Sequence, residues 1–228
     1  MNTYLIINNV DKKWLLFYAG LYFSLIISLI LGENSTGGAI IDYTENKKIS
    51  EHFSENFYKT FLSYDQYSTR HSPVFLIFLS FFKKFNLNDI FIRFIHMNLC
   101  LILPIYLFKS LNLVLKNKQI VLFLVSLVFI SPTFRSLSVW PDSRVLGLAF
   151  FTISIYYYLK FSVENKFIYC FKNIFFLSLS AYLSPNFAVF AIFYFYKYFL
   201  FYKNNFNYLI YIIIINLILS TPAFIYLD

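Results

Sequence analysis

Cysteine, charge and nucleotide-binding motifs are all scarce in this chain of 228 residues. Its two cysteines, Cys100 and Cys170, lie far apart inside apolar segments, so the sequence has neither a disulfide framework nor zinc-site spacing. Only 13% of its residues are charged, against roughly 25% in soluble domains. No glycine-rich phosphate loop and no G-x-S-x-G elbow is present. Any group donor that the protein uses is therefore expected to come from the membrane.

Apolar residues are correspondingly abundant. They make up 59% of the chain, and the mean hydropathy is +0.64. The sequence predicts an all-α membrane protein with about seven transmembrane helices, forming a single polytopic module over residues 1–228. The first apolar run is expected to be retained rather than cleaved. The expected spans are 14–31, 90–108, 120–130, 145–159, 167–183, 187–201 and 208–219.

The net charge is +8, and the positions of the positive residues agree with this topology. Most lysines stand in short groups at alternate ends of the apolar runs, which is the positive-inside pattern. The pattern predicts a cytoplasmic N-terminus and an integral membrane location, and it does not indicate a nucleic-acid partner. We expect the bacterial inner membrane, with the active face on the periplasmic, extracytoplasmic side.

One polar segment interrupts this apolar sequence. Residues 32–72 hold six of the eleven acids and are expected to form the first extracytoplasmic loop. Within it, residues 50–62 carry apolar side chains at helical spacing, which predicts an amphipathic helix on the membrane surface. The next apolar run, 73–82, is too short to span a bilayer and favours a second interfacial or re-entrant helix.

The first loop carries three candidate residues. Asp42 follows Gly37–Gly38, where the backbone can turn sharply and aim the carboxylate at the bundle. A carboxylate among apolar neighbours is a candidate base, because desolvation raises its proton affinity. Alternatively, Asp42 caps the following helix with Glu45 as its partner. At the far end, Arg70 and His71 precede a helix start and form either an anion site or a contact with lipid head groups.

The loop over residues 131–144 holds a second group of charges. Arg135 and Arg144 are candidate phosphate ligands. Asp142 is expected mainly to cap the following helix, and alternatively to hold Arg144 or to help bind a metal. Arg93 and His96, near the start of the second span, are expected either to face the bundle or to lie at the interface.

Four short stretches of the sequence resemble one known family. The early acid in GGAIIDY and the step RHSP, at the two ends of the first loop, resemble the GT-C glycosyltransferases, polytopic enzymes that use lipid-phosphate-linked sugars. The bacterial and eukaryotic protein mannosyltransferases are the relatives in question. The stretches SVWPDSRVLGLAFFTISIYYYLK (138–160) and SPNFAVFAIFYFYKYF (184–199) are similar to later parts of the same pattern. The sequence departs from the family where Asp42 is followed by Tyr43 rather than by a second acid.

The resemblance implies an inverting transfer of a sugar from a polyprenyl-phosphate donor to a lipid, glycan or protein acceptor. Asp42 would be the base, and Arg70, His71, Arg135 and Arg144 would bind the donor phosphate. Glu45 and Asp142 would be supporting acids, and these two acids with Asp42 would be the ligands of a divalent cation if one is used. Because GT-C enzymes are usually longer, the chain is expected to be an N-terminal fragment that is inactive alone. Two other classes remain open, namely a flippase or transporter of a lipid-linked intermediate and a non-catalytic membrane subunit.

Overall fold

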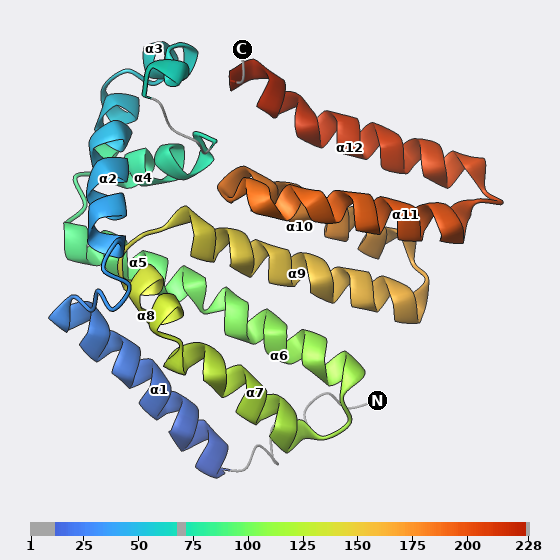
Figure 1. Ribbon diagram of the computed structural model, residues 1–228, viewed down its shortest axis with the longest axis horizontal. Coiled ribbons are helices and arrows are strands. Elements are labelled where there is room, and N and C mark those ends of the chain that lie inside the picture. The colour runs from blue at the N-terminus through green and yellow to red at the C-terminus, as the bar shows by residue number, and fades with distance from the viewer. Residues whose placement is uncertain (1–11, 68–71, 227–228) are drawn as a thin grey trace.

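The computed structural model describes residues 12–67 and 72–226, and this part of the chain is helical without any strand (Figure 1). The long apolar runs form helices with few interruptions, because no water competes for their backbone groups in an apolar setting. The helices are α1 (Lys12–Leu31), α2 (Ala39–Glu55), α3 (Phe57–Leu62), α4 (Val74–Lys84), α5 (Asp89–Cys100), α6 (Ile102–Val114), α7 (Lys118–Ile130), α8 (Pro132–Val139), α9 (Ser143–Glu164), α10 (Phe167–Leu183), α11 (Phe190–Tyr202) and α12 (Phe206–Tyr226), with the 3-10 helices η3 (Tyr64–Tyr67) and η4 (Pro185–Val189).

The all-α class is confirmed, and the length of several helices agrees with a membrane protein. Three helical segments are long and apolar enough to cross a membrane: α1, α5 with α6 as Asp89–Val114, and α9. The pair α7 and α8 gives a fourth if its 60° bend is counted within one span. Helix α10 and the part of α12 over Phe206–Pro222 are apolar but shorter. Three to four spans are therefore supported among the described residues, and the count of seven stays a prediction.

The long segments run in alternating directions and pack side by side (Figure 1). Their buried side chains form two main clusters. The first joins α1 and α2 to the helices from α4 to α9, and the second joins α9 to α10, α11 and α12. Helix α9 belongs to both clusters, so it fixes the N-terminal helices against the C-terminal ones.

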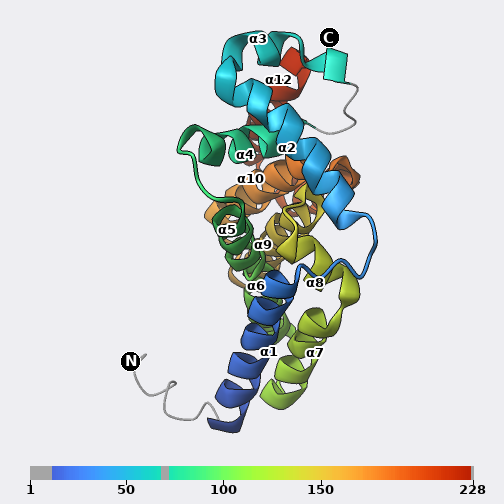
Figure 2. The same cartoon turned by 90° about the vertical axis from the view of Figure 1, so that its left-hand side faces the viewer.

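The polar segment after α1 lies at one end of these long helices. Figure 2 shows α2, α3 and α4 grouped there, with α8 close to the end of α1. The segment begins with a turn at Gly37, whose φ of +77° is readily adopted by glycine. The predicted turn at this position is therefore confirmed.

The predicted helix over residues 50–62 is wrong in its bounds. Helix α2 begins much earlier, at Ala39, and ends at Glu55, and the short α3 follows as a separate helix. The break falls at Asn56, whose side chain accepts a hydrogen bond from the Lys59 backbone N–H and so caps α3. The expected short helix after Pro73 is confirmed, because α4 covers Val74–Lys84.

The bend between α7 and α8 positions the second charged loop. Ser131 caps α8 by accepting a hydrogen bond from the Phe134 N–H, and Pro132 occupies the first turn, where its missing N–H costs nothing. Helix α8 ends at Val139, and the chain enters α9 through Asp142. Arg135 therefore lies on α8, while Arg144 lies in the first turn of α9.

Candidate functional site

The centre of the candidate site is the start of α9, where Asp142 performs two of the roles foreseen for it. One carboxylate oxygen accepts a hydrogen bond from the Arg144 backbone N–H at 2.7 Å, which caps the helix. Both oxygens also accept from Arg144 Nε, at 3.0 and 3.1 Å. The Asp142 side chain is only 5% exposed. A buried carboxylate needs such partners, because an unpaired charge is costly away from water.

Asp42 joins this pair from the first turn of α2. Its carboxylate lies 2.5 Å from Arg144 Nη2, and the same nitrogen lies 2.6 Å from the Asp142 carboxylate. The side chains of Asp42 and Arg144 are 42% and 49% exposed. One guanidinium therefore bridges two acids that are a hundred residues apart in sequence. We call Asp42, Asp142 and Arg144 the arginine bridge.

The capping alternative for Asp42 is wrong. Helix α2 starts at Ala39 behind Gly38, so Asp42 lies inside the first turn instead of ahead of it. An acid in the first turn still interacts favourably with the positive end of the helix macrodipole. Glu45, its supposed partner, lies one turn further on and is exposed, with no hydrogen bond or ion pair to the described residues.

A cavity of about 490 Å³ opens beside the arginine bridge. Arg144 forms part of its wall, together with polar side chains that include Ser131 and Asn186. The rest of the wall is mainly apolar and comes from α6 to α9 and η4: Leu103, Val128, Phe134, Leu137, Val145, Leu148 and Phe187. Arg144 Nε and Nη2 bind the two acids, whereas Nη1 donates to none of the described residues.

Helix α5 supports the chain between α8 and α9, which includes Asp142, through the side chain of His96. His96 is fully buried, with Nδ1 2.9 Å from the Ser138 carbonyl, and its Nε2 accepts from the Asp142 N–H at 3.2 Å. These two contacts fix the tautomer with the proton on Nδ1, since only a protonated nitrogen donates. Both Arg93 and His96 face the bundle, which was one of the two locations expected for them.

Arg93 supports the same loop by donating hydrogen bonds to backbone carbonyls. Its guanidinium donates to the carbonyls of Val139 and Leu29, at 3.1 and 3.2 Å, and stacks on the Trp140 ring at 3.6 Å. The Trp140 Nε1 donates to the Glu33 carbonyl at 3.0 Å. Arg93 therefore joins the end of α1 to the end of α8, which positions the loop without entering the cavity.

Arg135 does not join the arginine bridge. Its Nε donates to both carboxylate oxygens of Glu33, at 3.0 and 3.1 Å, and its Nη1 donates to Ser24 Oγ at 2.8 Å. A hydrogen bond from Nη2 to Ser28 completes the set. Burial raises the pKa of Glu33, but hydrogen bonds from Arg135 and Ser28 outweigh it and leave the pKa below its ordinary value. Arg135 is thus expected to be structural.

The α1–α2 loop is attached to α8 by hydroxyl contacts. Ser35 Oγ donates to the Pro132 carbonyl at 3.0 Å, and the hydroxyls of Thr36 and Ser136 lie 3.0 Å apart. These contacts bring the first and second loops together, which places α2 where Asp42 reaches Arg144.

Two of the predicted phosphate ligands, Arg70 and His71, lie outside the described residues. Among the residues that are described, no group of three or more His, Cys, Asp or Glu side chains has the arrangement of a metal site. Arg144 occupies the position between Asp42 and Asp142 where a cation would have to bind. The carboxylates of Asp42 and Asp142 are therefore both paired with Arg144.

Sequence reasoning missed two members of this region. Glu33 was not singled out, although an acid directly after a span must find a partner or water. Trp140 was not singled out either, and its stacking on Arg93 depends on a contact between distant segments. No local spacing signals either contact.

Comparison with known proteins finds no similar one: no family model, no curated protein and no solved structure matches the chain. The resemblance to GT-C glycosyltransferases therefore rests on the short motifs alone, and the function is argued from the geometry of the site.

Proposed function

We propose that the protein is a membrane glycosyltransferase of the GT-C type, which transfers a sugar from a polyprenyl-phosphate donor with inversion at the anomeric carbon. The observation that carries this proposal is the arginine bridge at the wall of a mainly apolar cavity. A lipid-linked donor needs an apolar groove for its chain, a cation for its phosphate and a carboxylate for the acceptor.

Arg144 is the first element of the proposed mechanism. Its Nη1, which donates to none of the described residues, and its position in the cavity wall make it the phosphate ligand, since a guanidinium binds phosphate through paired N–H donors. The two acids leave the arginine bridge with a formal charge of −1, so a phosphate would compete with Asp42 for the guanidinium. Binding of the donor would thus draw Arg144 toward the phosphate and release the Asp42 carboxylate.

The released Asp42 would then act as the base. It takes the proton from an acceptor hydroxyl, and that oxygen forms the new bond to the anomeric carbon. The bond between this carbon and the phosphate oxygen breaks, and the electron pair leaves with the polyprenyl phosphate. Asp142 keeps its hydrogen bonds to Arg144 at the start of α9 and so holds Arg144 near the reacting phosphate. No covalent sugar–enzyme intermediate forms.

The same proposal includes the finer topology. In it the protein has seven spans with the N-terminus in the cytoplasm, and the arginine bridge faces the extracytoplasmic side of a bacterial inner membrane. Lysines at the opposite ends of the helices support this orientation. These are Lys12 and Lys13 at the start of α1, Lys118 at the start of α7, Lys160 near the end of α9 and Lys203 after α11.

Sugar release from labelled donors tests the proposal. Membranes containing the full-length protein are incubated with polyprenyl-phosphate hexoses that carry the label in the sugar, and loss of label from the lipid phase is measured. We expect Asp42→Asn to slow this loss at least about 100-fold, the usual range for losing a general base. Arg144→Lys should raise the donor concentration needed, because a point charge replaces the fork of donors.

Glu55→Gln is the matched control, because Glu55 is an exposed acid at the other end of α2. This variant should retain full activity. Wild-type transfer by Asp42→Asn would exclude Asp42 as the base. Equal losses in both variants would mean that the charge of α2, rather than this carboxylate, matters.

A further inference from the structure

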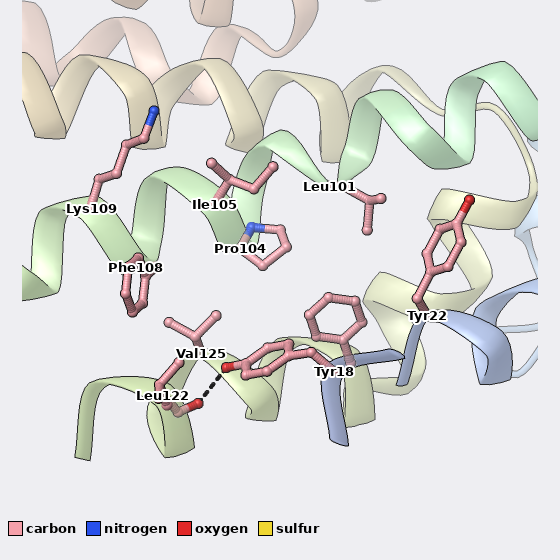
Figure 3. Close-up of a pocket in the computed structure, with 10 residues that line it drawn as sticks. Tyr18, Tyr22, Leu101, Pro104, Ile105, Phe108, Lys109, Leu122 and Val125 are labelled. Atoms are coloured by element: carbon pink, nitrogen blue, oxygen red, sulfur yellow. Dashed lines mark hydrogen bonds between the residues drawn. The ribbon is translucent and has the colours of Figure 1, made fainter. Parts of the chain in front are cut away.

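A second cavity lies elsewhere in the bundle, and none of the arginine bridge residues lines it. It has a volume of about 450 Å³ and is bounded by α1, α6 and α7 (Figure 3). Its walls include Tyr18, Ile105, Phe108 and Val125, with Lys109 as its one charged residue. We call it the α1–α6 cavity. It is of the size that small apolar ligands occupy in proteins.

The two tyrosine hydroxyls in its wall are already hydrogen-bonded to the protein. The Tyr18 hydroxyl donates to the Leu122 carbonyl at 2.5 Å, as the dashed line in Figure 3 shows, and the Tyr22 hydroxyl donates to Asn98 at 3.0 Å. The remaining surface is hydrocarbon and aromatic. Water would find few partners there, whereas an alkyl chain would bury apolar surface.

The form of the cavity follows from a break in the second long segment. Pro104 has no N–H to bond the Cys100 carbonyl, and α5 and α6 are separate helices on either side of Leu101. Ile105 in the next turn lines the cavity and is 49% exposed, so the wall is accessible from outside. Helix α1 packs against α7 more than against α6, which leaves the opening between α1 and α6.

Within the described residues, the charged side chains on the three helices that bound the cavity are all positive at this end. Lys12 and Lys13 begin α1, Lys109 lies in α6, and Lys118 begins α7. No acid occurs in residues 12–32 or 90–141, which include all three walls. Lys13 and Lys118 are exposed and make no ion pair with the described residues. Such a basic end next to an apolar cavity is complementary to an anionic head group on an acyl chain.

From this arrangement we propose that the α1–α6 cavity binds an anionic phospholipid, with one acyl chain between α1 and α6 and the phosphate among these lysines. The bilayer leaflet on that side supplies the lipid. The proposal is independent of the sugar transfer, because none of the arginine bridge residues lines this cavity.

Native mass spectrometry of the full chain in detergent tests the proposal, with dioleoyl phosphatidylglycerol and dioleoyl phosphatidylcholine as probes. The two lipids share their chains and differ in head-group charge. We expect one phosphatidylglycerol to bind each chain more tightly than phosphatidylcholine. The double variant Lys13→Gln with Lys118→Gln should reduce that preference about 25-fold, from about five-fold per lysine at a membrane surface.

Two matched controls separate this site from general lipid contact. Lys197→Gln with Lys203→Gln removes two exposed lysines at the same end of the bundle, on α11 and just after it, and should leave the preference unchanged. Ile105→Trp should fill the cavity and abolish the bound lipid, whereas Ile130→Trp, on an exposed position of α7 outside the cavity, should not.

Three results would overturn the proposal. One is equal binding of the two lipids, and another is an equal loss in both lysine pairs. The third is a lipid-free dimer that Ile105→Trp dissociates, since it would assign the opening to a second copy of the chain. Circular dichroism of each variant distinguishes loss of the site from loss of the fold.

Discussion

Arg135 and Arg144 lie nine positions apart in one short region, and each is paired with an acid from the first loop, yet their surroundings differ. All three nitrogens of the Arg135 guanidinium donate to the protein, and its side chain is 20% exposed. Arg144 has one nitrogen that donates to no described residue, is 49% exposed and lines a cavity. Two arginines of similar sequence context therefore divide into a structural and a candidate functional one.

The difference indicates how the role of an arginine in a mainly apolar protein can be interpreted. A guanidinium whose donors are all used by the chain stabilises the fold, because removing it leaves buried acceptors without partners. One with a donor left beside a cavity can bind a ligand. The number of donors left unused by the described residues therefore separates these two arginines, and their exposure agrees with it.

The largest expected difference between Arg135 and Arg144 is in how much each stabilises the fold. Arg135→Ala should lower the free energy of unfolding by about 3 kcal/mol, because it leaves the Glu33 carboxylate unpaired within the structure. Arg144→Ala should cost only about 1 kcal/mol, since water reaches that site and Asp142 still caps α9. Unfolding in detergent, followed by circular dichroism against denaturant, measures both. Similar losses in the two variants would remove the distinction.

A smaller effect concerns the two roles of Asp142. Asp142→Asn keeps an oxygen for the helix cap but loses the charge that holds Arg144, whereas Asp142→Ala loses both. We expect Ala to be less stable than Asn by about 1 kcal/mol, the usual worth of a cap. Both variants should weaken donor binding to a similar degree. If Asn and Ala are equally stable, the cap contributes nothing and the charge alone matters.

The smallest expected effect is the pH dependence of stability that comes from Glu33, the partner of Arg135. The pKa of Glu33 is lower in the folded protein than its ordinary value of 4.5, so its stabilising contribution is present above pH 4.5 and is lost as pH falls through the folded-state pKa. Melting temperature measured from pH 6 to pH 3 should therefore fall more steeply in wild type than in Glu33→Gln. The variant should also be less stable at pH 6. Parallel curves would show that the ion pair with Arg135 does not respond to protonation.

Local features of the site were predictable from sequence. An Asp ahead of a long apolar helix predicts a cap, and Asp142 is one. A glycine pair after a span predicts a sharp turn, and Gly37 makes it. The apolar runs gave helices in the expected places, because each needs only its own backbone to satisfy its hydrogen bonds.

The contacts between distant segments were not predictable. The pairing of Asp42 with Arg144 depends on where the packing of α2 on α4 places the start of α2 relative to α9, and no spacing in the sequence encodes it. The start of α2 was missed because residues 42–48 are mostly polar and lack an apolar period, so tertiary packing decides their helical state. Arg93 was placed inside the bundle only as one of two options, since its partners are backbone carbonyls that any residue supplies.

The division into two buried clusters has a consequence for synthesis. Apart from Leu183, every buried residue of the first cluster lies before α10, and the arginine bridge is complete once the start of α9 is in place. Chains fold from the N-terminus as they leave the ribosome. We therefore expect the three charged side chains to meet while the last three helices are still being translated, so that these later helices close the cavity around a centre already assembled.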